Sequence, residues 1–300
     1  MDIMNHAPFV APGLFGEEFR FREFQIMVET TFRSMRDDDG MLSTIWGTRI
    51  PADGSWVADP TVQLASALDR MDAADCEITV VTATKMWSHY YHHQLIMDYP
   101  LEPIAEAAAQ SNGRIVGALS YNPFRIEESL AEIEHAVREL GFKYVWFHPI
   151  TFGLAPDDRR CYPLYAKCAE LDIPVGLQVG HSAEVLPSEF GRPMGVDNVA
   201  IEFPRLRINL SHTGWPWTAE FCSMLWRHPH VYGDISAYFP SRLDAELVEF
   251  MDTGPGRRKV MFGTNGLDGL RCRTEFDELP ISDRAKTRIL RDNALQFLGY

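Results

Sequence analysis

Residues 208–217, INLSHTGWPW, indicate how the whole chain is built. From Arg207 to Leu210 polar and apolar side chains alternate, which is typical of a short strand. After Pro216, apolar residues recur at helical spacing, so a strand runs directly into a helix with His212 at the turn between them. In barrels of alternating strands and helices, side chains at such turns carry the chemistry.

The same succession of strand and helix recurs along the chain. Eight runs are predicted as strands, and segments with apolar residues at helical spacing separate them. The predicted strands are 1–6, 76–84, 115–121, 144–148, 175–180, 207–212, 231–238 and 259–265. Such alternation requires parallel strands, and eight of them in 300 residues favour an α/β fold closed as a TIM-type (β/α)8 barrel. No Gly-x-Gly-x-x-Gly motif, sequence repeat or boundary is present, so we expect one barrel domain over residues 1–300.

An insertion at residues 13–56 follows the first predicted strand. Within it, residues 17–35 have the apolar spacing of an amphipathic helix. Its apolar content exceeds what a free loop leaves exposed, so we expect a lid over the site or a contact with a second subunit. A homodimer or larger homo-oligomer is therefore expected. Arg49, in this insertion, is a candidate clamp for an anionic substrate.

Composition excludes several classes of partner. The chain has 42 acidic and 28 basic residues, and no cluster of Lys and Arg that would bind phosphates, so nucleic acid is not expected. No apolar run approaches the roughly 18 residues of a membrane span, and the start lacks the basic residues of a secretory signal. We therefore expect a cytoplasmic protein with a small-molecule substrate and no membrane partner. The five scattered cysteines form no Cys-x-x-Cys pair, which indicates buried, reduced thiols.

Residues 85–93, KMWSHYYHH, follow the second predicted strand and are dense in aromatic and imidazole groups. If this loop lies on the catalytic rim, Trp87 and His89 form part of the wall of a substrate pocket. The alternative is an ordinary packed aromatic loop.

Several strand ends resemble those of a known family. These are PVGLQVGH at 174–181, LSHTG at 210–214, VYGDIS at 231–236 and VMFGTN at 260–265, with ILRDNA at 289–294 near the end of the chain. Together they resemble the amidohydrolase superfamily, in the branch that includes aminocarboxymuconate semialdehyde decarboxylase and γ-resorcylate decarboxylase. The resemblance covers nearly the whole chain. It implies a distorted (β/α)8 barrel that hydrolyses or decarboxylates small carbonyl or carboxylate compounds, usually with one divalent metal.

The metal positions implied by the resemblance are altered in this sequence. The family's Asp-x-His-x-His on the first strand corresponds to residues 2–6, DIMNH, so its first histidine is replaced by Met4. The histidine on the family's fifth strand corresponds to Gln178, and the aspartate after its eighth strand corresponds to Asn265. Zinc prefers imidazole, thiolate or carboxylate, and a thioether or neutral amide is a poor replacement.

We therefore expect no metal cofactor. The retained histidines are His6 and His212, the second of which matches a family position used for acid–base work or as an extra ligand. The alternative is one zinc ion held weakly by His6, His181 and His212.

Polar side chains at five strand ends are expected to line one pocket. They are His6, His148, Gln178, His212 and Asn265. His212 is the candidate general acid or base. The amides of Gln178 and Asn265 can position a substrate carboxylate or polarise a carbonyl, and the alternative is that they are satisfied buried amides.

Three further residues lie within or near the ends of predicted strands. His181 is a catalytic candidate if the strand ends before it, because a step of three residues along a strand reaches the opposite face. Trp215 is expected to contact substrate. Asp234, inside the seventh predicted strand, is interpreted as a structural hydrogen-bond acceptor.

The expected function is that of a hydrolase or a carbon–carbon or carbon–oxygen lyase. Its substrate would be a small cyclic or aromatic carbonyl or carboxylate compound, and its chemistry would need no metal, because a positioned acid or base alone supplies about 10²–10⁴-fold. The first alternative is a metal-dependent decarboxylase or hydrolase of the same family. The second is a non-catalytic binding protein on the same fold.

Overall fold

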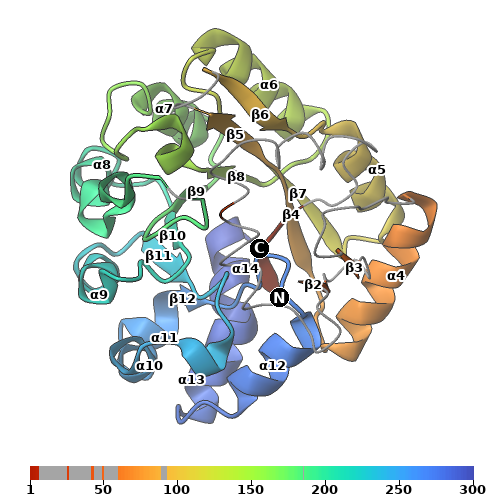
Figure 1. Cartoon of the computed structure of the whole chain (residues 1–300), viewed down its shortest axis with the longest axis vertical. Coiled ribbons are helices and arrows are strands. Elements are labelled where there is room, and N and C mark those ends of the chain that lie inside the picture. Colours follow the sequence, from red (N-terminus) through yellow and green to blue (C-terminus); the bar gives the residue numbers. More distant parts are fainter. Residues whose placement is uncertain (7–25, 27–41, 44–48, 51–59, 89–92, 185) are drawn as a thin grey trace.

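The computed structural model describes residues 1–6, 26, 42–43, 49–50, 60–88, 93–184 and 186–300. Within these residues, eight parallel strands form a nearly closed barrel that helices surround (Figure 1). The strand order is β1-β4-β7-β8-β9-β10-β11-β12. The strands are β1 (Asp2–His6), β4 (Thr79–Ala83), β7 (Ile115–Leu119), β8 (Tyr144–Phe147), β9 (Val175–Gln178), β10 (Ile208–Ser211), β11 (Val231–Asp234) and β12 (Val260–Met261). The predicted (β/α)8 architecture is confirmed.

Helices of the described chain surround the barrel or close one end of it. They are α4 (Pro60–Ala73), α5 (Glu102–Gln110), α6 (Ile126–Arg138), α7 (Tyr162–Glu170), α8 (Val196–Glu202), α9 (Thr218–Arg227), α10 (Ala245–Met251), α11 (Gly256–Lys259), α12 (Gly269–Asp277), α13 (Asp283–Thr287), the π-helical η6 (Arg288–Asp292) and α14 (Asn293–Leu298). Ser282 accepts a hydrogen bond from the backbone N–H of Ala285 and so caps α13.

Helix α6 shows how local sequence produces these elements. Glu127 and Glu128 lie in its first turn and Arg138 in its last, where each charge opposes the partial charge of the helix end. Ile133 is fully buried on the side that packs inward. The chain then leaves the helix through Gly141, at a φ of 73° that favours glycine.

Hydrogen bonds between β1 and the segment that directly follows β12 bring the barrel close to a full circle. The backbone N–H of Ile3 donates to Phe262 (3.1 Å), and that of Asn265 donates to Met4 (2.8 Å). The buried carboxylate of Asp2 accepts from the backbone N–H (2.9 Å) and the hydroxyl (2.6 Å) of Thr264. Asp2 therefore joins β1 to the segment after β12.

Helix α14 fills one end of the barrel. Phe297 packs edge-on against Tyr144, at a ring-centroid distance of 5.5 Å, and against Tyr232 at 5.3 Å. Both tyrosines lie at the amino ends of their strands, so this apolar plug closes the amino end. In barrels of this type, active sites lie at the opposite end, where the strands finish.

The strands are shorter than predicted, most of all β11 and β12, and the end of β11 changes the interpretation of Asp234. Strand β11 was expected over 231–238 but ends at Asp234, because the backbone N–H of Ser236 bonds to the side chain of Asp234 instead of to a neighbouring strand. Asp234 therefore lies at the end of its strand. Strand β12, expected over 259–265, ends at Met261, and Asn265 lies beyond it at a φ of 58°.

The aromatic segment after β4 is a hairpin where a loop was expected. Strand β5 (Lys85–Ser88) pairs antiparallel with β6 (Gln94–Asp98), and Lys85 lies opposite Asp98. The ammonium of Lys85 pairs with Asp98 and with Glu132 of α6 (3.4 Å), so charge pairing holds the hairpin against the barrel.

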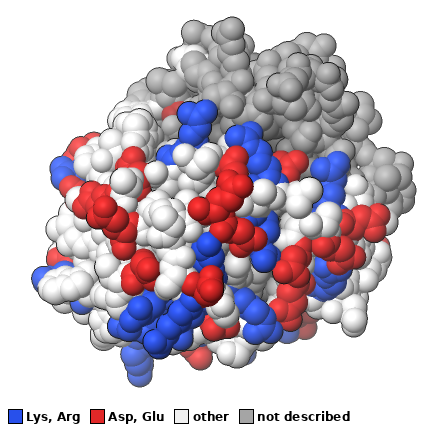
Figure 2. Space-filling view, turned by 90° about the horizontal axis from the view of Figure 1, so that it is seen from below, with Lys and Arg blue, Asp and Glu red and all other residues white. Residues whose placement is uncertain are grey.

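Most of the insertion at 13–56 lies outside the described residues, as does the helix predicted at 17–35. Its described part includes two short antiparallel strands, β2 (Leu42–Ser43) and β3 (Arg49–Ile50). Among the described helices, none has the length and apolar character needed to cross a membrane. The five cysteines are free and buried, as predicted. On the face shown in Figure 2, acidic and basic side chains are interspersed.

Candidate functional site

Three imidazoles surround the indole of Trp146 at the carboxyl ends of the strands. Ring-centroid distances from Trp146 are 5.4 Å to His6, 5.7 Å to His148 and 5.9 Å to His212. His6 is the last residue of β1, His148 directly follows β8 and His212 directly follows β10. Trp146 and His148 are fully buried and His212 nearly so. We call these three imidazoles the histidine cluster, and its members are strand-end residues that the sequence predicted to meet.

His212 is held in an unusual backbone conformation. Its φ is 76°, and the next residue, Thr213, has a φ of 57°. Both values lie in the left-handed region, which costs a residue with a side chain about 1–3 kcal/mol. The cost is offset by Asp234, whose carboxylate accepts from the backbone N–H of His212 (3.2 Å) and whose carbonyl accepts from that of Thr213 (3.0 Å).

Glu184 is a member of the site that sequence reasoning missed. It lies in the loop after β9, is 5% exposed, and places its Oε2 3.4 Å from Nε2 of His148. Burial acts to raise the pKa of Glu184, but the contact with His148, a backbone hydrogen bond and the nearby His6 together outweigh burial, and the pKa is lowered overall. The available signal was that Glu184 is the only carboxylate between Gln178 and Glu189, in a loop on the catalytic rim.

Burial keeps two of the three imidazoles neutral. It lowers the pKa of His6 from 6.5 to about 4, and the neighbouring His212 lowers it further, while Asn265 and Glu184 act in the opposite direction. Burial likewise lowers the pKa of His212 to about 4, against the charge of Asp234. Both rings are therefore proton acceptors over the ordinary pH range.

These depressed pKa values predict a stability that falls with acid. Between pH about 6.5 and 4 the unfolded chain binds protons that the folded His212 does not, so folding weakens as pH falls through this window. His212 contributes up to about 1.4 kcal/mol per pH unit, and the partly exposed His6 contributes less. Urea unfolding at pH 7, 5.5 and 4.5 measures the slope. His212→Asn should reduce it and the exposed His135→Asn should not; equal slopes in the two variants would contradict the assignment.

The two predicted amides occupy different positions around the cluster. The side chain of Asn265 interacts with His6 and raises the pKa of that ring in part. Gln178 is 5% exposed at the end of β9, where its backbone pairs in register with Ser211, the residue before His212.

His181 and Trp215 contact each other, and neither takes part in the ring contacts that define the histidine cluster. Strand β9 ends at Gln178, so His181 falls in the following loop, where it is exposed. Its ring packs against Trp215 at a centroid distance of 5.1 Å, and its Nδ1 lies 2.5 Å from the hydroxyl of Ser188. The structure thus places these two residues on the surface beside each other.

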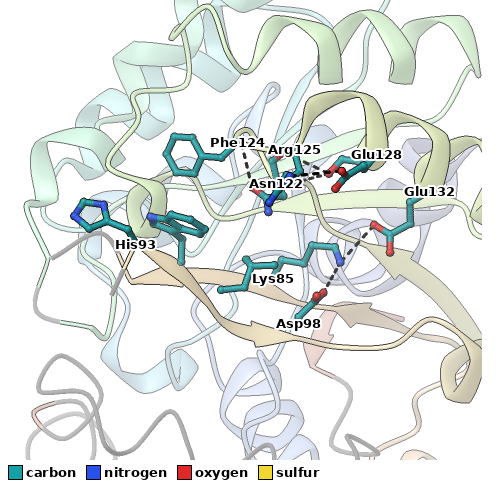
Figure 3. A pocket seen from close by; sticks show the side chains of 11 residues that line it. Lys85, His93, Asp98, Asn122, Phe124, Arg125, Glu128 and Glu132 are labelled. Carbon is teal, nitrogen blue, oxygen red and sulfur yellow. Dashed lines mark hydrogen bonds and ion pairs between the residues drawn. The ribbon is translucent and has the colours of Figure 1, made fainter. Parts of the chain in front are cut away.

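Trp87 lines a groove beside the hairpin. The groove has a volume of about 690 Å³ and lies between β5, β6 and the start of α6 (Figure 3). Its wall includes Lys85, Asp98 and Glu132, and none of its lining residues belongs to the histidine cluster. The Trp87 ring packs on Phe124 at a ring-centroid distance of 4.8 Å.

Two further predicted substrate contacts cannot be placed. His89 lies outside the described residues, and only the backbone of Arg49 is described.

The described residues do not fit the divalent metal that the family resemblance implies. No group of three or more His, Cys, Asp or Glu side chains among them is placed to hold an ion. Met4, at a family histidine position, is fully buried in the same apolar cluster as Trp146. Gln178 and Asn265 offer neutral amides where metals of this kind prefer imidazole and carboxylate.

Solved structures share this barrel at low sequence identity. An uncharacterised TIM-barrel protein of Bordetella bronchiseptica is 22% identical, with 99% of this chain and 97% of that one covered at a TM-score of 0.74. A 5-carboxyvanillate decarboxylase of Novosphingobium aromaticivorans, complexed with manganese and a nitrobenzoic acid, is 16% identical over 100% of this chain and 96% of that one, with a TM-score of 0.66.

A third solved structure also shares this barrel at low sequence identity. The 2,6-dihydroxybenzoate decarboxylase of Rhizobium is 16% identical over 77% of this chain and 86% of that one, with a TM-score of 0.58. At these identities the likeness establishes the fold. A search of curated proteins finds no match.

The family itself is established by sequence. The model of the amidohydrolase family matches residues 91–300, which is more than half of the chain and includes β7 to β12 with two of the three histidines of the cluster. This chain is a member of the amidohydrolase family.

Proposed function

We propose that this protein is a metal-independent enzyme that hydrolyses a small cyclic or aromatic ester, or a closely related carbonyl compound, with His212 as general base. The observation that carries the proposal is a set of buried polar atoms around that base. Nε1 of Trp146 and Nδ1 of His148 have no hydrogen-bond partner among the described residues, and Nε2 of His148 has only its 3.4 Å contact with Oε2 of Glu184. Unsatisfied buried polar groups are costly, and in active sites they commonly await a substrate or water.

The proposed reaction needs one base and one acid. Neutral His212 takes a proton from a water molecule, whose oxygen attacks the carbonyl carbon. His148, supported by Glu184, donates a proton to the leaving oxygen as the C–O bond breaks. The proton on His212 then passes to solvent, from which His148 is reprotonated. The amides of Gln178 and Asn265 are suited to donate hydrogen bonds to the developing oxyanion. Unactivated amides are poor substrates for such a site, because it lacks the polarising effect of a metal.

Decarboxylation is a second candidate, and the names of two structural neighbours favour it. In that reaction His212 would be protonated and would deliver its proton to the ring carbon as carbon dioxide leaves. The burial that lowers the pKa of His212 disfavours this resting form, so hydrolysis fits the site better.

The proposal predicts activity without metal. Residues Met4, Gln178 and Asn265 remove the anionic ligand and two nitrogen donors of the family site, so the purified protein should carry well under one equivalent of zinc or manganese. Dialysis against a chelator should leave the rate unchanged. Near-equimolar metal by plasma mass spectrometry, with activity lost in chelator and restored by the ion, would support the metal-dependent alternative.

A substrate screen tests the reaction class. Panels of small lactones, aryl esters and aromatic carboxylates are incubated with the protein and with His212→Asn as control. Release of acid from an ester or lactone supports hydrolysis, and release of carbon dioxide supports the second candidate. If no compound distinguishes the two proteins, the proposed catalytic role of His212 fails.

A further inference from the structure

Asp234 lies directly behind the proposed base and accepts hydrogen bonds on both of its oxygens. Its Oδ2 accepts from the side-chain amide of Asn209 (2.6 Å). Its Oδ1 accepts from the backbone N–H of His212 (3.2 Å), the backbone N–H of Ser236 (3.0 Å) and the hydroxyl of Ser236. All four groups are donors, so this fully buried carboxylate acts only as an acceptor.

Ser236 connects this carboxylate to the ring of His212. Its Oγ lies 2.6 Å from Nδ1 of His212. A serine hydroxyl has one proton, and a carboxylate accepts it more strongly than a neutral imidazole does. Because Ser236 donates to Asp234, its oxygen must accept from the imidazole. Nδ1 of His212 therefore carries the ring proton, and Nε2 carries the lone pair.

His6 provides a contrast within the same cluster. Its Nδ1 also contacts a hydroxyl, that of Thr84 at 2.7 Å. The hydroxyl of Thr84 is directed at the carbonyl of Thr82, at a distance of 3.5 Å that makes only a weak bond. No carboxylate bond to Thr84 is found among the described residues, so the hydroxyl beside His6 remains free to reorient.

We propose that Asp234 and Ser236 are positioning residues that hold His212 in the Nδ1-protonated tautomer and so reserve Nε2 as the basic nitrogen. The inference rests on the proposed role of His212 as general base. It changes the interpretation of Asp234 from a structural acceptor to the residue that orients the base through Ser236.

The tautomer can be measured without a substrate. In the wild-type chain labelled with ¹⁵N-histidine, the Nδ1 resonance of His212 should be of the protonated type and its Nε2 resonance of the lone-pair type. Assignment comes from the resonances lost in His212→Asn. Ser236→Ala removes the near acceptor and leaves Nδ1 only the weaker contact with the hydroxyl of Ser211 at 3.4 Å, so it should mix the two tautomers. Asp234→Ala removes every acceptor oxygen beside Ser236 and frees its hydroxyl to donate to Nδ1, so the Nε2-protonated form should prevail.

Thr84→Val is the matched control, because it removes a hydroxyl from the Nδ1 of a neighbouring imidazole without touching Asp234. It should leave the resonances of His212 in place. Far-UV circular dichroism verifies that each variant is folded, and Ser236→Ala serves as the test if Asp234→Ala does not fold.

With a substrate from the screen, Ser236→Ala should lower kcat by about 10-fold or more at nearly constant KM, since only correct protonation of the base is lost. A wild-type His212 protonated on Nε2, or a tautomer unchanged in the folded variants, would overturn the proposal. Failure of the proposed function is distinct: His212→Asn would then retain activity, whatever the tautomer measured in the wild type.

Discussion

His212→Asn should lower kcat/KM by about 10²–10⁴-fold, the range that a positioned base contributes. Asparagine is a polar side chain of moderate size that can stay near Ser236, but it has no nitrogen that accepts a proton from water. The loss should therefore fall mainly on kcat. The matched control is His135→Asn, which removes an exposed imidazole from α6 and should leave the rate unchanged.

The dependence of the wild-type rate on pH provides a second test of His212 as the general base. Burial holds the pKa of His212 near 4, so the rate should persist through pH 6.5 and fall only as pH approaches about 4, where the ring becomes protonated. An acid limb at the ordinary imidazole value of about 6.5 would show that the working base is less buried than His212. A His212→Asn variant with wild-type kcat/KM would remove this residue from the mechanism.

The sequence was sufficient for the barrel because its signals are local and repeated. Each strand is a short apolar run, and the helix after it has apolar residues at helical spacing. Eight weak signals of this kind support one architecture. Strand ends were harder to place. Asp234 was assigned to the interior of a strand, since nothing in VYGDIS reveals that Ser236 turns its backbone N–H to a side chain.

The meeting of three imidazoles could be predicted from the sequence, whereas their catalytic role stays a prediction. His6, His148 and His212 follow from the rule that strand ends meet at one rim, and Trp146 places them around one indole. Glu184 does not follow from that rule. It comes from a loop whose path is set by tertiary contacts, and a single glutamate in a loop has no periodicity to mark it. The exposure of His181 depended on where β9 ends, which periodicity locates only to within a few residues.

Trp146→Ala should lower the free energy of unfolding by about 3–5 kcal/mol, the cost of removing a fully buried aromatic side chain and leaving a cavity. The indole contacts every member of the histidine cluster, so its loss removes packing from three rings at once. Trp146→Phe is the matched control. It keeps an aromatic ring and deletes an indole N–H that has no hydrogen-bond partner among the described residues, so its cost should stay below about 1.5 kcal/mol.

Trp146→Ala should also change how the free energy of unfolding depends on pH, because burial is the main cause of the low pKa values of His6 and His212. Water entering the cavity left by Trp146→Ala should raise both values toward 6.5. The folded and unfolded chains would then bind protons over the same range, and the loss of stability between pH 6.5 and 4 should become shallower. Urea unfolding at pH 7 and pH 5 on the wild type and both variants measures the two effects together. If Trp146→Ala costs less than about 1 kcal/mol, or keeps the wild-type pH slope, the indole is not what excludes water from these imidazoles.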